Sequence, residues 1–400
     1  MKSKRDSQTG RPLRLLFINY EFPPIGGGGG RATANIVREL AAMGHEVTVM
    51  TSAYGNLPRD ECRDGYRIVR IPTIRFHHDR CSVVELGVFM MAAIVYSLKW
   101  VASNRPDVCI AFFTIPCGPA AYVLKQCYGI PYIVATCGGD IPGQGATVPG
   151  AMGRRLRFYH ALTRRVIRVL WKQAYQVVAT CRGLKALVER STDRRDVAII
   201  PNGVNAAFFT VKPSANQSSQ PFTILTVSRL CPQKGVDLVI HALHLIRDRL
   251  NRPWQLWIVG DGPSYAFLEA LAYERYGFHH EITFLRWQEA EQIRERQEQS
   301  NLFVLASYDE GLSLAVLEAM AGGLPVLGTH ISGVEELVIP GENGLLVPPG
   351  DVTALAEALL SLSSDEERLL AMGAVSREMA RRYNWQDIAE AYAELCRKAV

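Results

Sequence analysis

The stretch "SYDEGLSLAVLEAM", residues 307–320, joins a strand-like run at 302–306 to an apolar run that suits a helix. Glycine and serine at a junction between a strand and a helix are typical of phosphate or nucleotide sites, because a helix N-terminus offers free N–H groups. The same stretch carries two acids, Glu310 and Glu318, eight positions apart. In a site for a polyanion, two carboxylates need a separate explanation.

Short apolar strands alternate with helical segments on both sides of this stretch. That alternation is typical of parallel sheets covered by helices on both faces, and 400 residues favour two such domains. We therefore predict an α/β fold of two Rossmann-like, doubly wound domains facing a cleft, with ligands at the carboxyl ends of the strands. The expected strands are 13–20, 47–51, 107–113, 132–137 and 176–180 in the first domain, and 222–228, 255–260, 281–285, 301–307 and 324–329 in the second.

A polar stretch at 211–220 predicts the linker between the domains. The predicted N-terminal domain is 1–210, the predicted C-terminal domain is 211–383, and a last helix follows at 384–400.

Composition narrows the class of protein. An apolar fraction of 48% and a charged fraction of 21% indicate an ordinary folded chain. The nine cysteines are odd in number and include no Cys-x-x-Cys pair, which indicates reduced thiols in the cytoplasm. Residues 1–11 are polar and show no secretory signal. The most apolar window, 86–98, is shorter than the ~20 residues that span a bilayer, so we expect a buried helix there.

Charge is distributed unevenly along the chain. Residues 1–205 contain 28 Lys and Arg against 14 Asp and Glu, whereas residues 206–400 contain 16 against 25. A basic half attracts phosphates, anionic lipids or nucleic acid. Nucleic acid is not expected, because the sequence contains no interleaved stacking platform and no recognised binding module.

Two motifs of the C-terminal half follow strand ends. "VSRLCPQKG" brings Arg229 and Lys234 just past a strand, where a guanidinium and an ammonium suit a diphosphate. A solvated loop with two ordinary charges is the alternative. "VGDGP" ends another strand in a tight turn, and Gly260 would permit close approach of a ligand to the backbone, although a simple turn explains it equally.

The run "PPIGGGGGRATANIVREL" places five glycines between the first strand and its helix. This position favours a backbone nest that binds phosphate over a flexible surface loop. The run does not match the spaced dinucleotide fingerprint, and no acid closes the second strand, "VTVMT". A dehydrogenase is therefore disfavoured.

Taken in order, these motifs resemble a glycosyltransferase of the GT-B fold, in the large retaining family usually called family 4. The resemblance covers nearly the whole chain. Its most specific block fits the family pattern E-x7-E, and its parts are "LRLLFINYEFPPIGG", "GHEVTV", "PDV", "GGD", "IPNGV", "SRLCPQKG", "VGDGP", "ITFL", "EGLSLAVLEAMAGGLPVLGT" and "GENGLLVPPGD".

The resemblance implies a nucleotide-sugar donor, either a UDP- or a GDP-sugar, held mainly by the C-terminal domain, and an acceptor held by the N-terminal domain. It assigns the donor diphosphate to Arg229 and Lys234, the ribose hydroxyls to Glu318 and the transferred sugar to Glu310. It also implies that the last helix packs back onto the N-terminal domain. The remaining donor contacts implied by the resemblance and by the glycine turns are Gly27, Gly28, Gly260, Gly311, Leu312 and Ser313.

No Asp-x-Asp pair occurs in the chain. Sugar transferases of the other main fold commonly hold a metal with that pair, so we expect no metal cofactor, and we expect Arg229 and Lys234 to neutralise the leaving diphosphate. Paired glutamates also suit glycoside hydrolysis, but the surrounding phosphate-binding features disfavour a hydrolase. The family's mechanism is generally written as front-face transfer with retention, in which the leaving phosphate helps to deprotonate the acceptor.

The family often has His-Gly-x-Asp after its fourth N-terminal strand, where this chain reads "TCGGD". Cys137 stands in the place of the histidine, which puts a catalytic histidine there in doubt. Asp140 is the N-terminal candidate for contacting the sugar or orienting the acceptor. Capping of its own loop is an equal alternative.

The segment "RRLRFYHALTRRVIRVLWK", residues 154–172, has seven basic residues and no acid. At ~100° per residue its basic side chains share one helical stripe, and Leu156, Tyr159, Leu162, Val166 and Leu170 lie on another face, with Trp171 toward the boundary. Such a helix favours an anionic membrane surface or a lipid-linked acceptor, against the alternative of a core helix with a basic solvent face. The stripe consists of Arg154, Arg157, Arg165, Arg168 and Lys172.

The sequence therefore predicts a retaining glycosyltransferase, expected in surface-polysaccharide assembly in the cytoplasm or on the inner face of the cell membrane. A lipid-linked or surface glycan is the expected acceptor. The alternatives are a soluble transferase that acts on a small acceptor such as a sugar phosphate, and a catalytically inactive membrane-associated partner subunit.

Overall fold

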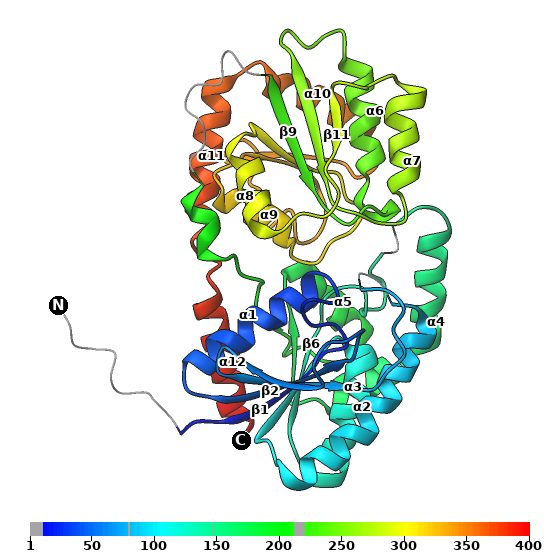
Figure 1. The fold of residues 1–400 in the computed structure, drawn as a ribbon, viewed down its shortest axis with the longest axis vertical. Coiled ribbons are helices and arrows are strands. Elements are labelled where there is room, and N and C mark those ends of the chain that lie inside the picture. Colours follow the sequence, from blue (N-terminus) through cyan, green and yellow to red (C-terminus); the bar gives the residue numbers. More distant parts are fainter. Residues whose placement is uncertain (1–10, 79–80, 146, 212–220) are drawn as a thin grey trace, which may run out of the picture.

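The fold consists of two α/β domains, one in each half of the chain, and each is built on a largely parallel sheet (Figure 1). The computed structural model describes residues 11–78, 81–145, 147–211 and 221–400. Most of the expected tail, 1–11, and most of the expected linker, 211–220, lie outside the described residues. The predicted pair of Rossmann-like domains is confirmed.

The N-terminal sheet has eight strands in the order β3-β4-β2-β1-β5-β6-β7-β8. Every neighbouring pair is parallel except β3 and β4. Nearly continuous burial of the central strands reflects their apolar sequences, which helices cover on both faces. The strands are β1 Arg14–Ile18, β2 Glu46–Ser52, β3 Asp60–Arg63, β4 Tyr66–Ile71, β5 Val108–Phe112, β6 Tyr132–Ala135, β7 Gln176–Ala179 and β8 Ala198–Ile199.

Two layers of helices cover this sheet. One hydrophobic cluster joins α1 and α12 to one face, and another joins α2, α3, α4 and α5 to the opposite face. α12 lies against α1, although the two helices stand at opposite ends of the sequence (Figure 1). The helices are α1 Gly28–Ala42, α2 Val83–Ser103, α3 Thr114–Tyr128, α4 Gly150–Gln173, α5 Arg182–Ser191 and α12 Trp385–Ala399.

The C-terminal sheet has six parallel strands in the order β11-β10-β9-β12-β13-β14. Its strands are β9 Phe222–Val227, β10 Trp254–Val259, β11 Ile282–Phe284, β12 Leu302–Leu305, β13 Val326–Thr329 and β14 Gly344–Val347. Its α-helices are α6 Val236–Ile246, α7 Tyr265–Ala270, α8 Ala290–Glu298, α9 Leu314–Ala321, α10 Val352–Ser363 and α11 Glu366–Ala380. Short helical turns are η1 Ala206–Thr210, η2 Pro232–Lys234 and η3 Leu271–Arg275.

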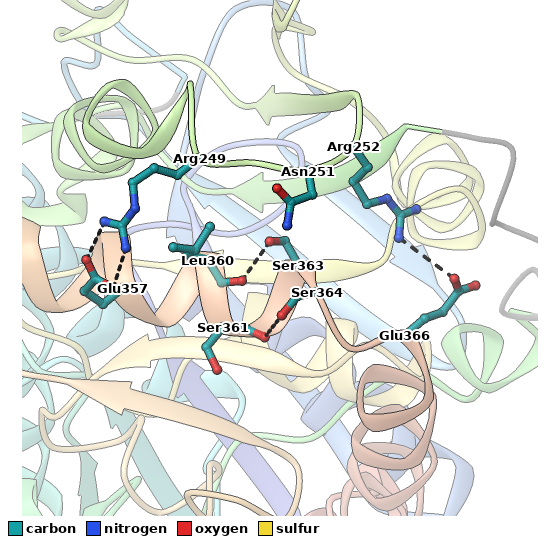
Figure 2. Close-up of a pocket in the computed structure, with 9 residues that line it drawn as sticks. All are labelled: Arg249, Asn251, Arg252, Glu357, Leu360, Ser361, Ser363, Ser364 and Glu366. Carbon is teal, nitrogen blue, oxygen red and sulfur yellow. Dashed lines mark hydrogen bonds and ion pairs between the residues drawn. The ribbon is translucent and has the colours of Figure 1, made fainter.

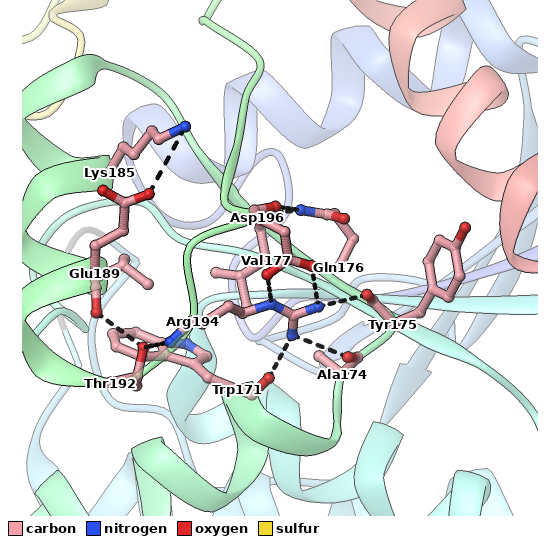
Figure 3. A network of polar contacts seen from close by, with 11 residues as sticks. Trp171, Ala174, Tyr175, Gln176, Val177, Lys185, Glu189, Thr192, Arg194 and Asp196 are labelled. Carbon is pink, nitrogen blue, oxygen red and sulfur yellow. Dashed lines mark hydrogen bonds and ion pairs between the residues drawn. The ribbon is translucent and has the colours of Figure 1, made fainter.

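The C-terminal end of α4 is fixed by Arg194, whose guanidinium lies among the carbonyl groups that the helix leaves free (Figure 3). It donates to the carbonyl oxygens of Trp171 at 2.6 Å, Ala174 at 2.9 Å and Tyr175 at 2.6 Å. Asp196 balances its charge, with a carboxylate oxygen 2.6 Å from Arg194 Nε. These hydrogen bonds satisfy the end of the helix and hold α4 in one rotation against the sheet.

That rotation differs from the one expected for the basic segment. The five predicted basic residues are exposed, but so are Leu162 and Val166, which the sequence placed on a separate apolar face. Trp171 is completely buried and donates to Thr114 Oγ1 at 2.9 Å. The core side of the helix is the stripe of Gly153, His160, Ile167, Leu170 and Trp171. Apolar and basic side chains therefore share the solvent face of α4.

The buried helix expected at 86–98 is also corrected. α2 runs from Val83 to Ser103, which is long and apolar enough to span a membrane by length and composition, and only 22% of its most apolar window is buried. Its core contacts repeat every fourth residue, at Phe89, Ala93 and Val101 among others. α2 is thus anchored along one stripe and leaves much of its apolar surface exposed.

We predict that Trp385→Ala destabilises the N-terminal domain. Trp385 begins α12, is buried, and lies so close to Gly203 that a Cβ there would be 2.7 Å from its ring. Removing a buried tryptophan costs about 3–5 kcal/mol, so the midpoint of urea unfolding should fall clearly. The exposed neighbour Gln386→Ala is the control, and equal midpoints for the two variants would contradict the packing role of α12.

Candidate active site

The loops after β9 and β12 form the centre of the site. Lys234 Nζ lies 2.6 Å from Glu310 Oε1, and the same oxygen accepts a hydrogen bond of 2.8 Å from Ser307 Oγ. Glu310 is buried, and a buried carboxylate needs such partners. The two sequence motifs that carry Lys234 and Glu310, 76 positions apart, therefore meet at the carboxyl ends of neighbouring strands.

Backbone contacts bring the lysine loop to this place. The Gln233 carbonyl oxygen accepts from the N–H of Tyr308 at 2.8 Å, and the Gln233 side chain donates from Nε2 to the Asp309 carbonyl at 2.9 Å. Gly235 follows with a φ of +59°, and a Cβ there would be 2.1 Å from the Ala306 carbonyl oxygen. The glycine after Lys234 is required because the chain crosses the end of β12 in a left-handed turn.

Arg229 leaves the end of β9 as an exposed side chain. Burial raises the pKa of Glu21 in the N-terminal domain, and hydrogen bonds from Gly27 and Gly30, the charge of Arg75 and, least of all, the charge of Arg229 offset part of this rise. Arg229 thus interacts electrostatically with the N-terminal domain, whereas Lys234 pairs with Glu310 of its own domain.

The N-terminus of α9 faces the N-terminal domain through Gly311, Leu312 and Ser313. Ser313 is the N-cap, and its side chain makes no capping hydrogen bond to the first N–H groups of α9. The Leu312 carbonyl accepts from Asn202 Nδ2 at 2.9 Å. A Cβ on Gly311 would be 3.2 Å from the Cys137 carbonyl oxygen, so glycine permits this close approach of the domains.

Glu318, four residues into α9, is buried and reaches a cation of the other domain. Arg31 Nη1 lies 3.2 Å from Glu318 Oε1. Burial raises the pKa of Glu318, and the charge of Arg31 partly offsets this. A hydroxyl that bound Glu318 would share the carboxylate with Arg31 or displace it.

The glycine run divides into two parts. Glu21 accepts hydrogen bonds from the N–H groups of Gly27 at 3.3 Å and Gly30 at 3.0 Å, so a protein carboxylate already occupies part of the nest expected for phosphate. A Cβ at Gly29 would be 2.6 Å from the Phe113 ring. A Cβ at Gly27 would meet nothing within 4 Å, and one at Gly28 only Leu314 of α9 at 3.5 Å. Gly27 and Gly28 are therefore the glycines with open space toward the other domain.

Gly260 is required by the protein itself. It has a φ of +133°, and a Cβ there would be 1.9 Å from the Ser228 carbonyl oxygen. The turn after β10 thus packs against the loop that carries Arg229. The structure explains the glycine by a backbone contact, and contact of Gly260 with a donor stays a prediction.

Asp140 holds its own loop together. Its carboxylate accepts from the N–H and the hydroxyl of Thr114 at 2.6 and 2.8 Å, and from the N–H groups of Cys137 and Gly138 at 3.1 and 3.2 Å. Burial raises its pKa, and these hydrogen bonds offset part of that rise. The geometry matches the alternative of a loop cap, because four donors already occupy the carboxylate. Contact of Asp140 with sugar or acceptor stays an untested prediction.

The loop pinned by Asp140 continues across to the C-terminal domain. Gln144 is buried and donates from Nε2 to Asp309 Oδ1 at 2.6 Å and to the Glu310 carbonyl at 3.1 Å. Thr147 donates to the Tyr308 carbonyl at 2.8 Å. The N-terminal loop therefore holds the backbone of the Glu310 segment in place.

Two family models match successive parts of this chain. The family model "Glycosyl transferase 4-like domain" matches residues 27–203, and the model "Glycosyl transferases group 1" matches residues 209–379. The chain belongs to the group 1 glycosyltransferases.

Individual relatives agree with this membership. A GDP-mannose-dependent alpha-(1-6)-phosphatidylinositol monomannoside mannosyltransferase of Mycolicibacterium smegmatis is 28% identical over 93% of this chain and 94% of its own length. Sucrose-phosphate synthase from Thermosynechococcus elongatus has a similar structure, with a TM-score of 0.84, 22% identity, and coverage of 96% of this chain and 98% of that one. Anabaena HepE in complex with UDP and glucose has a TM-score of 0.72 and 19% identity, and the match covers 96% and 98% of the two chains. This glycosyltransferase therefore has the GT-B fold and uses a nucleotide-sugar donor.

Several residues of the glycosyltransferase site were missed by the sequence. Arg31, Gln144 and Asn202 form contacts across the domain interface. Arg31 directly follows the glycine run and Asn202 lies within "IPNGV", so these two residues at least adjoin motifs that the sequence analysis quoted. Gln144 lies in a loop with no motif, so its contact with Asp309 could be found only in three dimensions.

The C-terminal domain also contains a hollow far from these residues (Figure 2). Its volume is about 550 Å³, and the segments after α6 and around the end of α10 line it. Arg249 and Arg252 are already paired there with Glu357 and Glu366, at 2.7 and 3.9 Å. It adjoins the start of β10 at Trp254, whereas ligands of such sheets bind at the carboxyl ends of the strands. We therefore do not assign the donor to this hollow.

A pH dependence follows from Asp309. Burial, with the nearby charge of Glu310, raises the pKa of Asp309 to about 7. At pH values between the ordinary and the raised pKa, Asp309 therefore keeps its proton in the folded protein but has lost it in the unfolded chain. Stability should accordingly fall as pH rises through this window, from about 4 to about 7.

We predict that Asp309→Asn, which stays neutral and keeps the acceptor for Gln144, has a smaller fall in its unfolding midpoint than the wild type over this pH range. The exposed Asp248→Asn is the control. Parallel curves for wild type and Asp309→Asn would show that Asp309 does not titrate there.

Proposed function

We propose that this glycosyltransferase transfers a sugar, with retention and without a metal ion, from a UDP- or GDP-sugar to a hydroxyl of a lipid-linked or surface glycan at the inner face of the cell membrane. The observation that carries the catalytic part is the Lys234–Glu310 pair beside the uncapped N-terminus of α9. This arrangement places a cation, a helix N-terminus that can bind an anion, and a carboxylate that can accept a hydrogen bond from a hydroxyl group in one site.

The cationic groups take the charge of the donor diphosphate in this proposal. Arg229 and Lys234 follow β9, and the N–H groups at 313–315 of the α9 terminus lie in the same region as Glu310. A helix N-terminus and a guanidinium both favour phosphate oxygens. Charge that develops on the leaving phosphate would be stabilised there without a protein nucleophile.

The two carboxylates bind hydroxyl groups. Glu310 would accept a hydrogen bond from a hydroxyl of the transferred sugar while Lys234 turns toward the phosphate. Glu318 would accept from the ribose hydroxyls, and Arg31 would then share or release the carboxylate. Retention follows in this scheme from front-face transfer, in which the leaving phosphate receives the proton of the acceptor hydroxyl.

The metal independence rests on the same cations. Among the residues that the structure describes, no group of three or more His, Cys, Asp and Glu side chains could hold a metal ion. We propose that Arg229 and Lys234 supply the positive charge instead.

The acceptor is proposed from the chemistry of the N-terminal domain. Its basic α4 and the name of the mycolicibacterial relative, a phosphatidylinositol monomannoside mannosyltransferase, support a lipid-linked acceptor. The similar structure named sucrose-phosphate synthase keeps the alternative of a small sugar-phosphate acceptor open. An inactive partner subunit is disfavoured by the intact Lys234–Glu310 pair.

We predict that Glu310→Gln lowers donor turnover roughly 100-fold, because a charged hydrogen-bond acceptor for the sugar is lost. The control is Glu357→Gln, which removes another ion-paired glutamate of the same domain at its opposite edge. Turnover should be measured with nucleotide release as the readout, with and without EDTA. Unchanged turnover of Glu310→Gln would overturn the site assignment, and loss of wild-type activity in EDTA would overturn metal independence.

Donor choice is tested by thermal stability. We predict that a UDP- or a GDP-sugar raises the unfolding midpoint of the wild type and that an ADP-sugar does not, because only a bound ligand stabilises the folded state by mass action. Lys234→Ala should abolish the rise. A response to ADP-sugars alone would contradict the proposed donor class.

A further inference from the structure

The helices α2, α3 and α4 lie together on one side of the N-terminal domain (Figure 1). Several apolar side chains of α2 and α4 are exposed to solvent. On α4, Phe158 and Leu162 are 73% and 72% exposed, and Val169 follows on the same stripe at 50%. On α2, Val84 is 73% exposed, and Met91 and Val95 repeat the spacing of one helical face. We call the surface of these six side chains the outer helical face.

Large apolar side chains gathered on two exposed helices mark a surface for interaction, and the charge around them indicates the partner. The three helices contain nine Lys and Arg residues and one acid, Glu85. Glu85 is buried, where it forms a capping box with Ser82 and accepts from the N–H of Phe76 at 2.8 Å. The exposed charge of the layer is therefore entirely basic, and on α4 the arginines flank Phe158 and Leu162 on the same solvent side.

We propose that the outer helical face docks on an anionic lipid bilayer, with the apolar side chains of α2 and α4 entering the interface and the arginines of α4 binding lipid phosphates. An apolar stripe beside Lys and Arg is the pattern of helices that lie in a membrane interface. This inference rests on the membrane part of the proposed function and deepens it. The added point is that apolar side chains of α2 enter the membrane interface, whereas the basic side chains of α4 attract the protein to anionic lipids.

α2 does this without leaving the domain. Phe89, Ala93 and Val101 anchor one stripe of the helix in the core, and pulling α2 into a bilayer as a span would expose them. Arg194 likewise fixes the end of α4. The face is therefore rigid and meets the membrane as a surface.

The face also lies on the correct side of the site. In a parallel βαβ unit each helix runs back along the strands, so the first turns of α2 and α4 lie at the edge where the strands end. α4 begins at Gly150, three residues after Thr147 contacts the Tyr308 carbonyl. Val84 of the outer helical face lies in the first turn of α2. Docking at this end of the face brings lipid headgroups to the edge of the N-terminal domain whose loop contacts the segment around Glu310.

The test is flotation of the full-length protein with vesicles of phosphatidylcholine, with or without phosphatidylglycerol. We expect binding to the anionic vesicles at about 0.15 M salt, with a measurable part retained at about 1 M salt, where exposed charges are screened. The uncharged variants Val84→Ser/Met91→Gln and Phe158→Ser/Leu162→Ser should lose this salt-resistant part. Arg154→Gln/Arg165→Gln should lose roughly 5-fold in affinity for each basic side chain, and only at low salt.

The matched control is Phe267→Ser, which removes a 60%-exposed phenylalanine from α7 of the C-terminal domain and should bind like the wild type. Hydrogen exchange should show new protection in α2 and α4 when anionic vesicles are added. Absence of wild-type binding, or equal binding by all variants, would overturn the proposal. A wild-type dimer that the serine variants convert to a monomer, without vesicle binding, would assign the face to a second copy instead.

Donor turnover without vesicles separates this inference from the catalytic proposal. The face variants should retain wild-type nucleotide release in solution, and Glu310→Gln should float like the wild type. A variant that no longer floats but keeps its turnover therefore has a defect in the outer helical face alone. A variant that floats but has lost its turnover has a defect in the catalytic site alone.

Discussion

The contact between Lys234 and Glu310 is the interaction on which the site depends. A buried carboxylate is unfavourable without partners, and Glu310 has two, at 2.6 and 2.8 Å. Meeting both requires that the loop after β9 cross the end of β12, which only Gly235 allows at that position. Lys234 and Ser307 thus fix Oε1 of Glu310, and the turn at Gly235 brings Lys234 to this place. Fixing Glu310 also positions the backbone that leads into α9.

The second constraint is contact between the domains. Gln144, Thr147 and Asn202 donate to the backbone of residues 308–312, and Arg31 pairs with Glu318. The N-terminal domain therefore holds the segment of the C-terminal domain that is predicted to bind the nucleotide sugar. Asp140 in turn fixes the N-terminal loop that makes these contacts.

The sequence predicted the fold well where periodicity and strand-end motifs are local. Alternating apolar strands gave two Rossmann-like domains, and "SRLCPQKG" and "DEGLSLAVLEAM" marked residues that the structure brings together at Lys234 and Glu310. It did not predict the contacts that the protein itself makes with some of these residues. Glu21 accepts hydrogen bonds from the glycine run, and four donors bind Asp140, which matches the alternative of a loop cap that the sequence left open. The rotation of α4 depends on Trp171 reaching Thr114 and on Arg194 at the helix end, and neither contact leaves a periodic signal.

Our central claim is that the two acids bind hydroxyl groups and leave the diphosphate to the cations. Titration calorimetry can test it by comparing a nucleoside diphosphate with its 2′,3′-dideoxy analogue on wild type and Glu318→Ala. The account predicts that the analogue binds wild type roughly 10-fold more weakly, a charged hydrogen bond being lost, and that Glu318→Ala binds the two ligands equally. An equal loss for the analogue on both proteins would contradict it.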